Sequence, residues 1–418
     1  MAGCVGVLHE APIDAGASDS GTEDAGTSDA GASDAGSRDA GSGDAGSSDA
    51  GALSALPPMP VISRGAPAYA SSGTAGLAND SSYDTIWRSN ETTSAAAPSW
   101  LAYDLSGVPA AHRGRVDVAW YNGNGGYDEY DLFAKADAGA VAYNDPRDYT
   151  LEGNGAPGGT LPDAGWVVLL TMAGNTYISR EHVLDLTGYN WLRMNVTAIN
   201  GTTFNLNTAV NLDVHDASLG AEDSWLFLGD SITAFTYRND GASIGAPSFA
   251  ELVNSSAPAY FPAAQGAGEG GWTSYTALSL ASPDGGGTLF DAWLETFPGH
   301  YVALLYGTND GANGSGDATP TYNNFVTMVN KVLAAGKIPC IPHVPWAQDT
   351  GHQLNAQLIN AKLDQLYAQY PKVIPGPDLY TVMLNQNQYF QDSLHPNPQG
   401  RAAYRQAWAN AMVGRVYP

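Results

Sequence analysis

Apolar and polar residues follow three different patterns along the chain. Residues 1–60 show almost no apolar periodicity, and residues 61–220 alternate apolar and polar positions over short stretches. From residue 221 to residue 418, continuous apolar runs alternate with amphipathic stretches. Alternation with a period of two indicates half-buried strands, whereas short apolar runs between helical patterns indicate the buried strands of a parallel sheet. The pattern therefore predicts three parts, with boundaries near residues 60 and 220.

The middle part, residues 61–220, is predicted to be an all-β sandwich of the jelly-roll kind. Stretches such as 116–121 and 165–170 alternate apolar with polar residues, and they are rich in Val, Thr, Tyr and Trp. Turns rich in Gly and Asn, at 122–126 and 153–159, separate such stretches at the spacing of short strands. Many short strands with regular turns are typical of a sandwich.

The last part, residues 221–418, is predicted to be an α/β domain. Its apolar runs at 224–228, 300–305 and 337–341 are short enough for buried strands. Between 353 and 370, apolar residues recur at steps of three and four, which places them on one face of a helix. Strands that alternate with helices form a parallel sheet covered on both faces, and its active site lies at the carboxyl ends of the strands.

The first part, residues 1–60, is predicted to be a disordered stalk. Asp-Ala-Gly recurs every five residues from 14 to 51, and the first 52 residues carry ten acidic side chains and one basic one. Such a composition cannot bury enough apolar surface to fold. Ala2, Gly3 and Cys4 resemble the end of a bacterial lipoprotein signal sequence, which implies an exported protein anchored through a lipid on Cys4. The alternative is that Cys4 is an accidental thiol.

Charge and cysteine content exclude several classes of function. The chain has 17 Lys and Arg against 42 Asp and Glu, a formal net charge of -25, so binding to nucleic acid or to an anionic membrane surface is not expected. No apolar run reaches the roughly 20 residues of a membrane-spanning helix. The two cysteines, Cys4 and Cys340, lie too far apart in sequence to indicate a disulfide framework, and the eight scattered histidines show no zinc motif. A monomer is expected.

Candidate catalytic residues follow the predicted strands of the last part. Ser231 comes directly after the first strand, and Asn309 comes after a later one. Asp392 and His395 precede the last predicted helix. An imidazole can remove the proton of a serine hydroxyl while a carboxylate orients it. Asn309 and the backbone N–H of Gly271 could stabilise an oxyanion, so the set indicates acyl transfer.

The blocks around Ser231, Gly271, Asn309 and His395, in this order, resemble those of the SGNH (GDSL-type) hydrolases over essentially all of residues 223–418. The resemblance implies a three-layer α/β/α fold and ester hydrolysis without a cofactor. It implies that Ser231 is the nucleophile, His395 the general base and acid, and Asp392 its orienting partner. The oxyanion hole would consist of the N–H groups of Ser231 and Gly271 and the side-chain amide of Asn309.

The middle part resembles the discoidin-like, galactose-binding sandwiches that often serve as carbohydrate-binding modules. Asp80, Thr85 and Trp87 match the entry pattern of that family, in which the tryptophan is expected in the core. The family implies a structural calcium ion, held here by Asp80, Thr85 and Asp213, because calcium takes hard oxygen ligands. The alternative for Asp80 is an ordinary Asp-Ser turn.

Three further residues are candidates for substrate contact. Trp272 follows the oxyanion residue Gly271, and His343 and Trp346 follow the predicted strand at 337–341. Indole faces pack well on sugar rings, so these residues could bind a glycan. Buried structural roles are the alternative for all three.

Together these observations predict a serine esterase that removes acetyl or other short acyl groups from a polysaccharide, such as acetylated xylan or mannan, through an acyl-enzyme. The fusion to a sugar-binding-like module and the exported stalk support that substrate. One alternative is a short-chain lipid or aryl esterase, or a lysophospholipase. A second alternative is a glycan-binding surface protein without catalytic activity.

Overall fold

The computed structural model describes residues 56–83, 85–121, 145–200, 206–236, 247–282, 287–311 and 316–417, without the side chain of Phe235. Cys4 and nearly all of the predicted stalk lie outside the described residues, as does the turn predicted at 122–126. Residues Leu53–Pro418 form one compact unit. The boundary near residue 220 between two separate domains stays a prediction.

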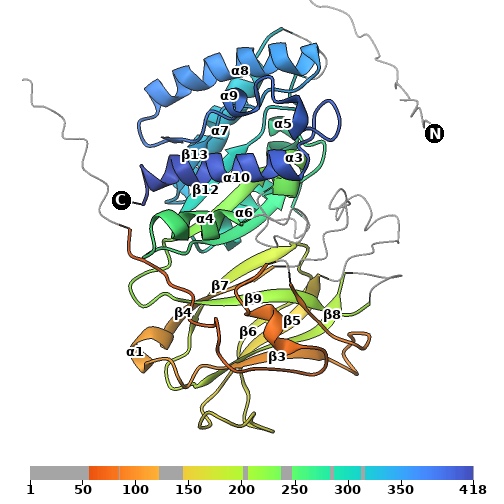
Figure 1. The fold of residues 1–418 in the computed structure, drawn as a ribbon, viewed down its shortest axis with the longest axis vertical. Helices are drawn as coiled ribbons and strands as arrows, with labels where there is room; N and C mark the ends of the chain where they lie inside the picture. The colour runs from red at the N-terminus through yellow and green to blue at the C-terminus, as the bar shows by residue number, and fades with distance from the viewer. Residues whose placement is uncertain are drawn as a thin grey trace, which may run out of the picture. The chain divides into compact units, whose positions relative to one another are not determined.

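The first half of the described chain is antiparallel (Figure 1). One sheet has the strand order β1-β3-β8-β5-β6, and the other has the order β2-β9-β4-β7. The strands are β1 Ala68–Ala70, β2 Trp87–Arg88, β3 Ser99–Asp104, β4 Arg115–Tyr121, β5 Pro146–Asn154, β6 Val167–Met172, β7 Ser179–Asp185, β8 Trp191–Ile199 and β9 Ala209–Asp216. Two short helices, the 3-10 helix η1 Ala75–Ala78 and α1 Ala110–Arg113, lie between them.

Both antiparallel sheets contribute to one hydrophobic core. Its buried members include Leu101 and Leu192 from the first sheet and Trp120 and Val214 from the second. Trp87, expected in the core, has no exposed surface, so that prediction is confirmed. The all-β prediction therefore holds as two antiparallel sheets, whereas the sandwich arrangement itself stays a prediction.

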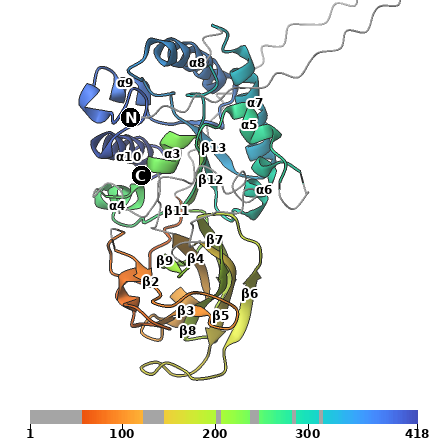
Figure 2. The same ribbon diagram turned by 90° about the vertical axis from the view of Figure 1, so that its right-hand side faces the viewer.

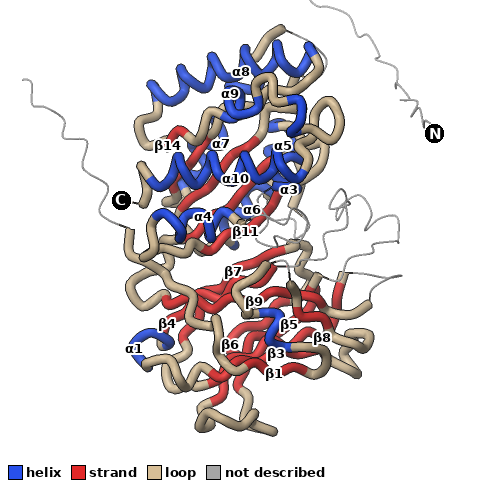
Figure 3. Tube along the Cα trace, in the orientation of Figure 1, coloured by secondary structure: helices blue, strands red, loops and turns tan. Residues whose placement is uncertain are grey.

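The second half contains a parallel sheet with the strand order β11-β10-β12-β13-β14 (Figure 3). Its strands are β10 Ser224–Gly229, β11 Ala263–Gly268, β12 Tyr301–Leu305, β13 Ile338–Ile341 and β14 Ile374–Pro375. The three apolar runs of the sequence therefore form β10, β12 and β13. The free cysteine Cys340 is buried in β13.

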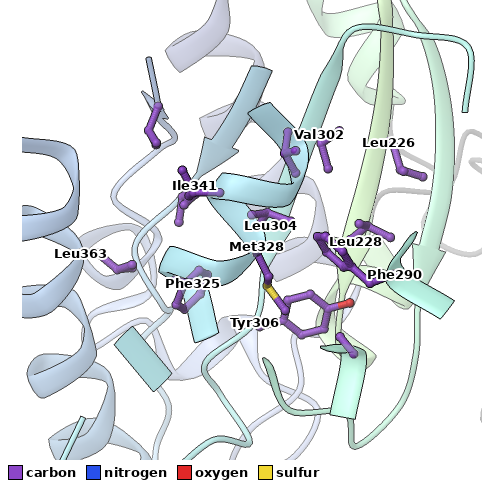
Figure 4. Packing of buried hydrophobic residues seen from close by; sticks show 14 of the residues in the cluster. Leu226, Leu228, Phe290, Val302, Leu304, Tyr306, Phe325, Met328, Ile341 and Leu363 are labelled. Carbon is purple, nitrogen blue, oxygen red and sulfur yellow. The ribbon is translucent and has the colours of Figure 1, made fainter. Parts of the chain in front are cut away.

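Helices cover both faces of this sheet (Figure 2). Trp225 and Phe227 of β10 point to one face and pack with residues of α4, α9 and α10. Leu226 and Leu228 point to the other face, where α6, α7 and α8 supply the apolar partners (Figure 4). The helices are α3 Ser231–Thr236, α4 Phe249–Ser256, α5 Ser274–Ser279, α6 Leu289–Thr296, α7 Thr319–Ala334, α8 Thr350–Gln369, α9 Leu379–Met383, the 3-10 helix η3 Asn387–Tyr389, and α10 Pro398–Val413. The layers are those of an α/β/α fold.

Side-chain caps fix where the long helices begin. Asp349 accepts a hydrogen bond from the backbone N–H of His352, so α8 begins three residues before the apolar periodicity that predicts it. Asn397 accepts from the N–H groups of Gln399 and Gly400 and starts α10. Within the described ranges, no helix combines the length and the apolar character that a membrane span requires.

The antiparallel strands contact the edge strand β11 of the parallel sheet. Tyr121 of β4 packs in a buried cluster with Phe261 and Ala263. The hydroxyl of Ser179 accepts from the N–H of Gly266 at 2.9 Å and donates to its carbonyl at 3.2 Å. This junction therefore combines apolar packing with hydrogen bonds to a strand of the parallel sheet.

Three carboxyl groups are buried at or beside this junction: Asp117 on β4, Glu181 on β7, and Asp223 just before β10. Burial raises the pKa of each, and for Asp223 it does so to about 7, against the effect of a hydrogen bond from Tyr417. The Tyr417 hydroxyl donates to Asp223 Oδ1 at 2.7 Å, and the Ser224 hydroxyl donates to Glu181. Around neutral pH, burial therefore makes ionisation of these three carboxyl groups unfavourable.

Candidate active site

The candidate site forms where three parallel strands end side by side. Gly229, the last residue of β10, is paired with Gly268 of β11 and with Leu305 of β12. Ser231 follows β10, Gly271 follows β11 and Asn309 follows β12. The sheet therefore brings three of the sequence-predicted blocks to one edge, as parallel strands require.

Close packing at this edge explains why position 268 is a glycine. The helix α3, which begins at Ser231, crosses directly over Gly268. A Cβ atom on Gly268 would lie 2.3 Å from the backbone nitrogen of Ala234. Any side chain there would displace α3 and with it the hydroxyl of Ser231.

Ser231, His395 and Asp392 form a chain of hydrogen bonds. The Ser231 Oγ atom lies 3.0 Å from His395 Nε2, and His395 Nδ1 lies 2.9 Å from Asp392 Oδ2. Ser231 is largely buried, at 7% exposure, whereas Asp392 is half exposed. The structure thus joins residues that are more than 160 positions apart in the sequence, with the imidazole between the hydroxyl and the carboxylate.

Asp392 is held by the backbone of its own loop. Its Oδ1 accepts from the N–H groups of Leu394 at 2.8 Å and His395 at 2.6 Å. Partial burial works to raise the pKa of Asp392, but these bonds and the one to the imidazole outweigh it, so the pKa lies below its usual value. Asp392 is therefore an anion at neutral pH, which suits a group that orients and stabilises an imidazolium.

A second carboxyl group, Asp230, lies next to Ser231 but is buried. Its Oδ1 accepts from the N–H of Ile232 at 2.9 Å. Burial raises the pKa of Asp230 to about 7, in spite of that hydrogen bond and others. The pKa values of two acids near one serine are thus shifted in opposite directions: burial raises that of Asp230, and hydrogen bonds lower that of the more exposed Asp392.

The two further oxyanion candidates lie on neighbouring loops. Gly271 is exposed and has a φ of 73°, a left-handed conformation that favours glycine. The side-chain amide of Asn309 donates to the carbonyl of Trp272 at 3.0 Å. An amide nitrogen carries two hydrogens, so this bond orients the group and leaves a second donor.

No role was predicted for Asp310, although it directly follows Asn309. Its carboxylate accepts from the N–H of Ser274 at 3.1 and 3.0 Å, from the hydroxyl of Ser274, and from the N–H of Gly307 at 3.1 Å. Asp310 therefore ties the loop after β11 to the loop after β12. The sequence signal was an acid beside the predicted oxyanion residue, but its partner Ser274 could not be identified without the fold.

The three residues predicted to contact substrate all have other partners. Trp346 is 7% exposed and packs edge-on against Phe390, so little of its indole face is left for a sugar. Trp272 is half-buried and packs against Trp293. Both ring nitrogens of His343 have partners: Nδ1 lies 3.3 Å from Asp378 Oδ1, and Nε2 lies 3.1 Å from Asp364 Oδ1. Substrate contact by these residues stays a prediction.

The three predicted calcium ligands form hydrogen bonds of their own. Both carboxylate oxygens of Asp80 lie within 2.9 Å of the Thr85 hydroxyl, and the buried Asp213 accepts from Tyr83. Calcium takes six to eight oxygen ligands. In the part of the chain that the structure describes, no group of three or more His, Cys, Asp or Glu residues could hold a metal ion. These residues do not by themselves fit such a cage, and calcium here stays a prediction.

Comparison with known proteins bears on the last part of the chain. Residues 227–403 match the model of the GDSL-like Lipase/Acylhydrolase family. No curated protein is similar enough to match the chain. Similar solved structures include the psychrotrophic esterase EstA from Pseudoalteromonas sp. (20% identity, 46% of this chain and 98% of that chain covered, TM-score 0.36). They also include a carbohydrate esterase family 3 protein from Talaromyces cellulolyticus (16% identity, 46% of this chain and 97% of that chain covered, TM-score 0.35). A third is the protein YXIM from Bacillus subtilis (12% identity, 82% of this chain and 87% of that chain covered, TM-score 0.40).

The matched segment begins within β10 and ends within α10, so it spans the whole candidate site. It contains Ser231, Asp392 and His395, which the fold joins through hydrogen bonds. The family match and the parallel sheet agree on the same part of the molecule. The chain therefore contains a GDSL/SGNH acylhydrolase domain, and such a domain implies the hydrolysis of esters.

Proposed function

We propose that this protein is a serine esterase that removes acetyl groups from a polysaccharide, such as acetylated xylan or mannan. The observation that carries the proposal is the chain of hydrogen bonds from Ser231 through His395 to Asp392 at the carboxyl end of a parallel sheet. The geometry suits a nucleophile, its base and the group that orients the base.

In the proposed mechanism, Ser231 Oγ attacks the carbonyl carbon of the acetyl ester while His395 Nε2 takes the hydroxyl proton. The carbonyl electron pair moves to oxygen, and Asp392 stabilises the imidazolium through Nδ1. When the tetrahedral intermediate collapses, the bond to the sugar oxygen breaks and His395 gives that oxygen its proton. Water, activated by the same imidazole, then releases acetate from Ser231 in the reverse sequence.

The oxyanion of each tetrahedral intermediate would be bound by the N–H groups of Ser231 and Gly271 and by the side chain of Asn309. Donors of this kind, fixed before the reaction, typically contribute about 3 kcal/mol each to lowering the barrier. The hydrogen bond from Asn309 to the Trp272 carbonyl supports this role, because it fixes the orientation of the amide.

An exposed aromatic side chain near the site supports a sugar substrate. Tyr275 is 68% exposed. Among the exposed large apolar side chains of the described residues, it is the aromatic one. It follows Trp272 by three residues, on the helix that begins at Ser274. Aromatic faces pack on the apolar faces of sugar rings. The resemblance of residues 61–220 to sugar-binding modules is a second argument for a glycan.

Acetate release tests the substrate. We expect the purified protein to free acetate from acetylated xylan or mannan and also to cleave a short-chain chromogenic ester. The measurement is enzymatic quantification of acetate, with chemically deacetylated glycan as the control. Cleavage of the chromogenic ester without acetate from any acetylated glycan would contradict the glycan substrate. A preference for acyl chains beyond four carbons would favour a lipid or aryl esterase, or a lysophospholipase, in its place.

The pH dependence of the rate tests the role of the histidine. Because imidazole must be neutral to accept the serine proton, we expect kcat/KM to fall in the acidic range. Asp392, whose pKa lies below its usual value, stays ionised in that range and does not account for the loss. Asp230→Asn is the control, since the neighbouring acid should not define the acid limb. A rate that stays level down to pH 4 would refute the proposed base.

Export and anchoring belong to the proposal as well. The Asp-Ala-Gly tract after Cys4 suits a stalk that holds the enzyme away from a membrane to which Cys4 is lipid-linked. A polysaccharide is then the expected partner, encountered by a monomer at the cell surface.

A further inference from the structure

Asp310 connects the two loops that carry the proposed oxyanion donors. Its Oδ2 accepts from the N–H of Gly307 on the loop after β12. Both of its oxygens accept from the N–H of Ser274, at the start of α5 on the loop after β11. The hydroxyl of Ser274 donates to the same carboxylate and accepts from Asn324 Nδ2 of α7 at 2.9 Å. Asp310 is therefore bound from both sides by groups that are themselves fixed.

A second cross-link runs parallel to the first. The amide of Asn309 donates to the carbonyl of Trp272, which lies one residue after Gly271 and two before Ser274. Asn309 and Asp310 thus bind the same short stretch of the loop after β11. The position of Gly271 relative to Asn309 depends on both bonds. A shift of about 1 Å in such groups typically costs about 100-fold in rate.

The chemistry of the contact requires a carboxylate. All the donors that meet Asp310 are N–H or O–H groups, and an ionised carboxylate offers two oxygens that only accept. Burial raises the pKa of Asp310, and the bonds from Ser274 and Gly307 act against that rise. An asparagine of the same size would present an NH2 group to one of these donors. The cross-link would then lose a hydrogen bond to one of the two loops.

We propose that Asp310 is a positioning residue that sets the separation of the Gly271 N–H and the Asn309 amide, and hence the fit of the oxyanion hole. This inference rests on the proposed esterase function. It assigns Asp310 no contact with substrate. Its effect on the rate passes through Asn309 and Gly271, which distinguishes it from a residue that only stabilises the fold.

The test is a double-mutant cycle in the full-length protein with a short-chain chromogenic ester. We expect Asp310→Asn to lower kcat by about 10- to 100-fold with KM changed less than about threefold. Asn309→Ala alone should lower kcat by about 100- to 1,000-fold. In the Asn309→Ala background, Asp310→Asn should lower kcat by a clearly smaller factor than it does alone, because one of the two donors whose separation it sets is already gone.

Two further variants make the cycle decisive. Asp317→Asn is the matched control, since Asp317 also accepts a backbone N–H, that of Thr319 at the start of α7, but is exposed and lies at the α7 end of the loop after β12, eight residues after Asn309. Its kcat should equal that of the unmodified protein. Ser274→Ala removes the hydroxyl donor alone and serves if Asp310→Asn does not fold. It should show a smaller loss in kcat, which also shrinks in the Asn309→Ala background.

The outcomes separate this inference from the proposed function. If the unmodified protein and Ser231→Ala cleave the ester equally, the esterase mechanism is wrong and this inference falls with it. If Ser231→Ala is inactive but Asp310→Asn loses the same factor with and without Asn309, the function stands and the positioning role is wrong. A change confined to KM or to the melting temperature would overturn the positioning role in the same way.

Discussion

Replacing Ser231 with alanine is expected to lower kcat for ester hydrolysis by about 10,000-fold or more. The Ser231 hydroxyl lies 3.0 Å from His395 Nε2, and without it no acyl-enzyme can form. Residual rate above that of water should remain, since the oxyanion donors and the imidazole are still in place. The measurement is the initial rate with a short-chain chromogenic ester, together with acetate release from the glycan.

Ser255→Ala provides the matched control for this variant. Ser255 lies on the exposed side of α4, and its hydroxyl donates only to the carbonyl of Leu252, one turn earlier. This control should retain full activity, and both variants should melt at the temperature of the unmodified protein. Substantial hydrolysis by Ser231→Ala would show that another residue is the nucleophile.

Replacing Asp223 with asparagine is expected to stabilise the protein at pH 8. Burial raises the pKa of this carboxyl from 3.8 to about 7, so at pH 8 the folded protein holds a buried anion. A shift of about 3 pH units corresponds to about 4 kcal/mol of unfolding free energy, at 1.36 kcal/mol per unit. Asparagine keeps an oxygen for the Tyr417 hydroxyl, although its NH2 group offsets part of the gain.

The pH dependence of this contribution to stability is opposite to that of an acid whose pKa is lowered by folding. Since the folded protein holds this proton more tightly than the unfolded chain, the contribution of Asp223 is most favourable below about pH 4. It is lost as the pH rises to about 7. The advantage of Asp223→Asn should therefore shrink by about 3 kcal/mol between pH 8 and pH 5. Urea unfolding of both proteins at the two pH values measures this difference.

Other groups in the protein titrate in the same range but cancel in this comparison. Burial lowers the pKa of His182 to about 3, which favours the folded state as the pH rises. That contribution is common to the variant and the unmodified protein. Exposed Asp163→Asn is the charge-matched control and should change stability equally little at both pH values. An Asp223→Asn variant that is less stable at pH 8 than at pH 5, relative to the unmodified protein, would refute the buried anion.

Local sequence patterns predicted the elements of the α/β part closely. The apolar run at 224–228 became β10, and the helical periodicity of 353–370 became α8, Thr350–Gln369. These features depend on neighbours along the chain. The serine, aspartate and histidine became candidates because each stands beside a strand end or a helix start, and the α/β fold brings such ends together.

Long-range contacts could not be predicted in the same way. His343 was a candidate for substrate contact, but it meets Asp364 and Asp378, which lie 21 and 35 residues further on. The role of Asp310 depends on Ser274, 36 residues earlier. The buried position of Asp223 depends on Tyr417, at the far end of the chain. Charge patterns along a sequence do not show which acids a fold will bury.

The acid and the base of the proposed relay come from one loop of four residues, in which backbone N–H groups bind the carboxylate of Asp392. Asp392 binds the N–H and the ring of His395, so the pair keeps its geometry whatever Ser231 does. A single displacement of this loop would disengage the serine without separating histidine from aspartate. Control of such an enzyme could therefore act on the single contact between Ser231 and His395, with the rest of the relay unchanged.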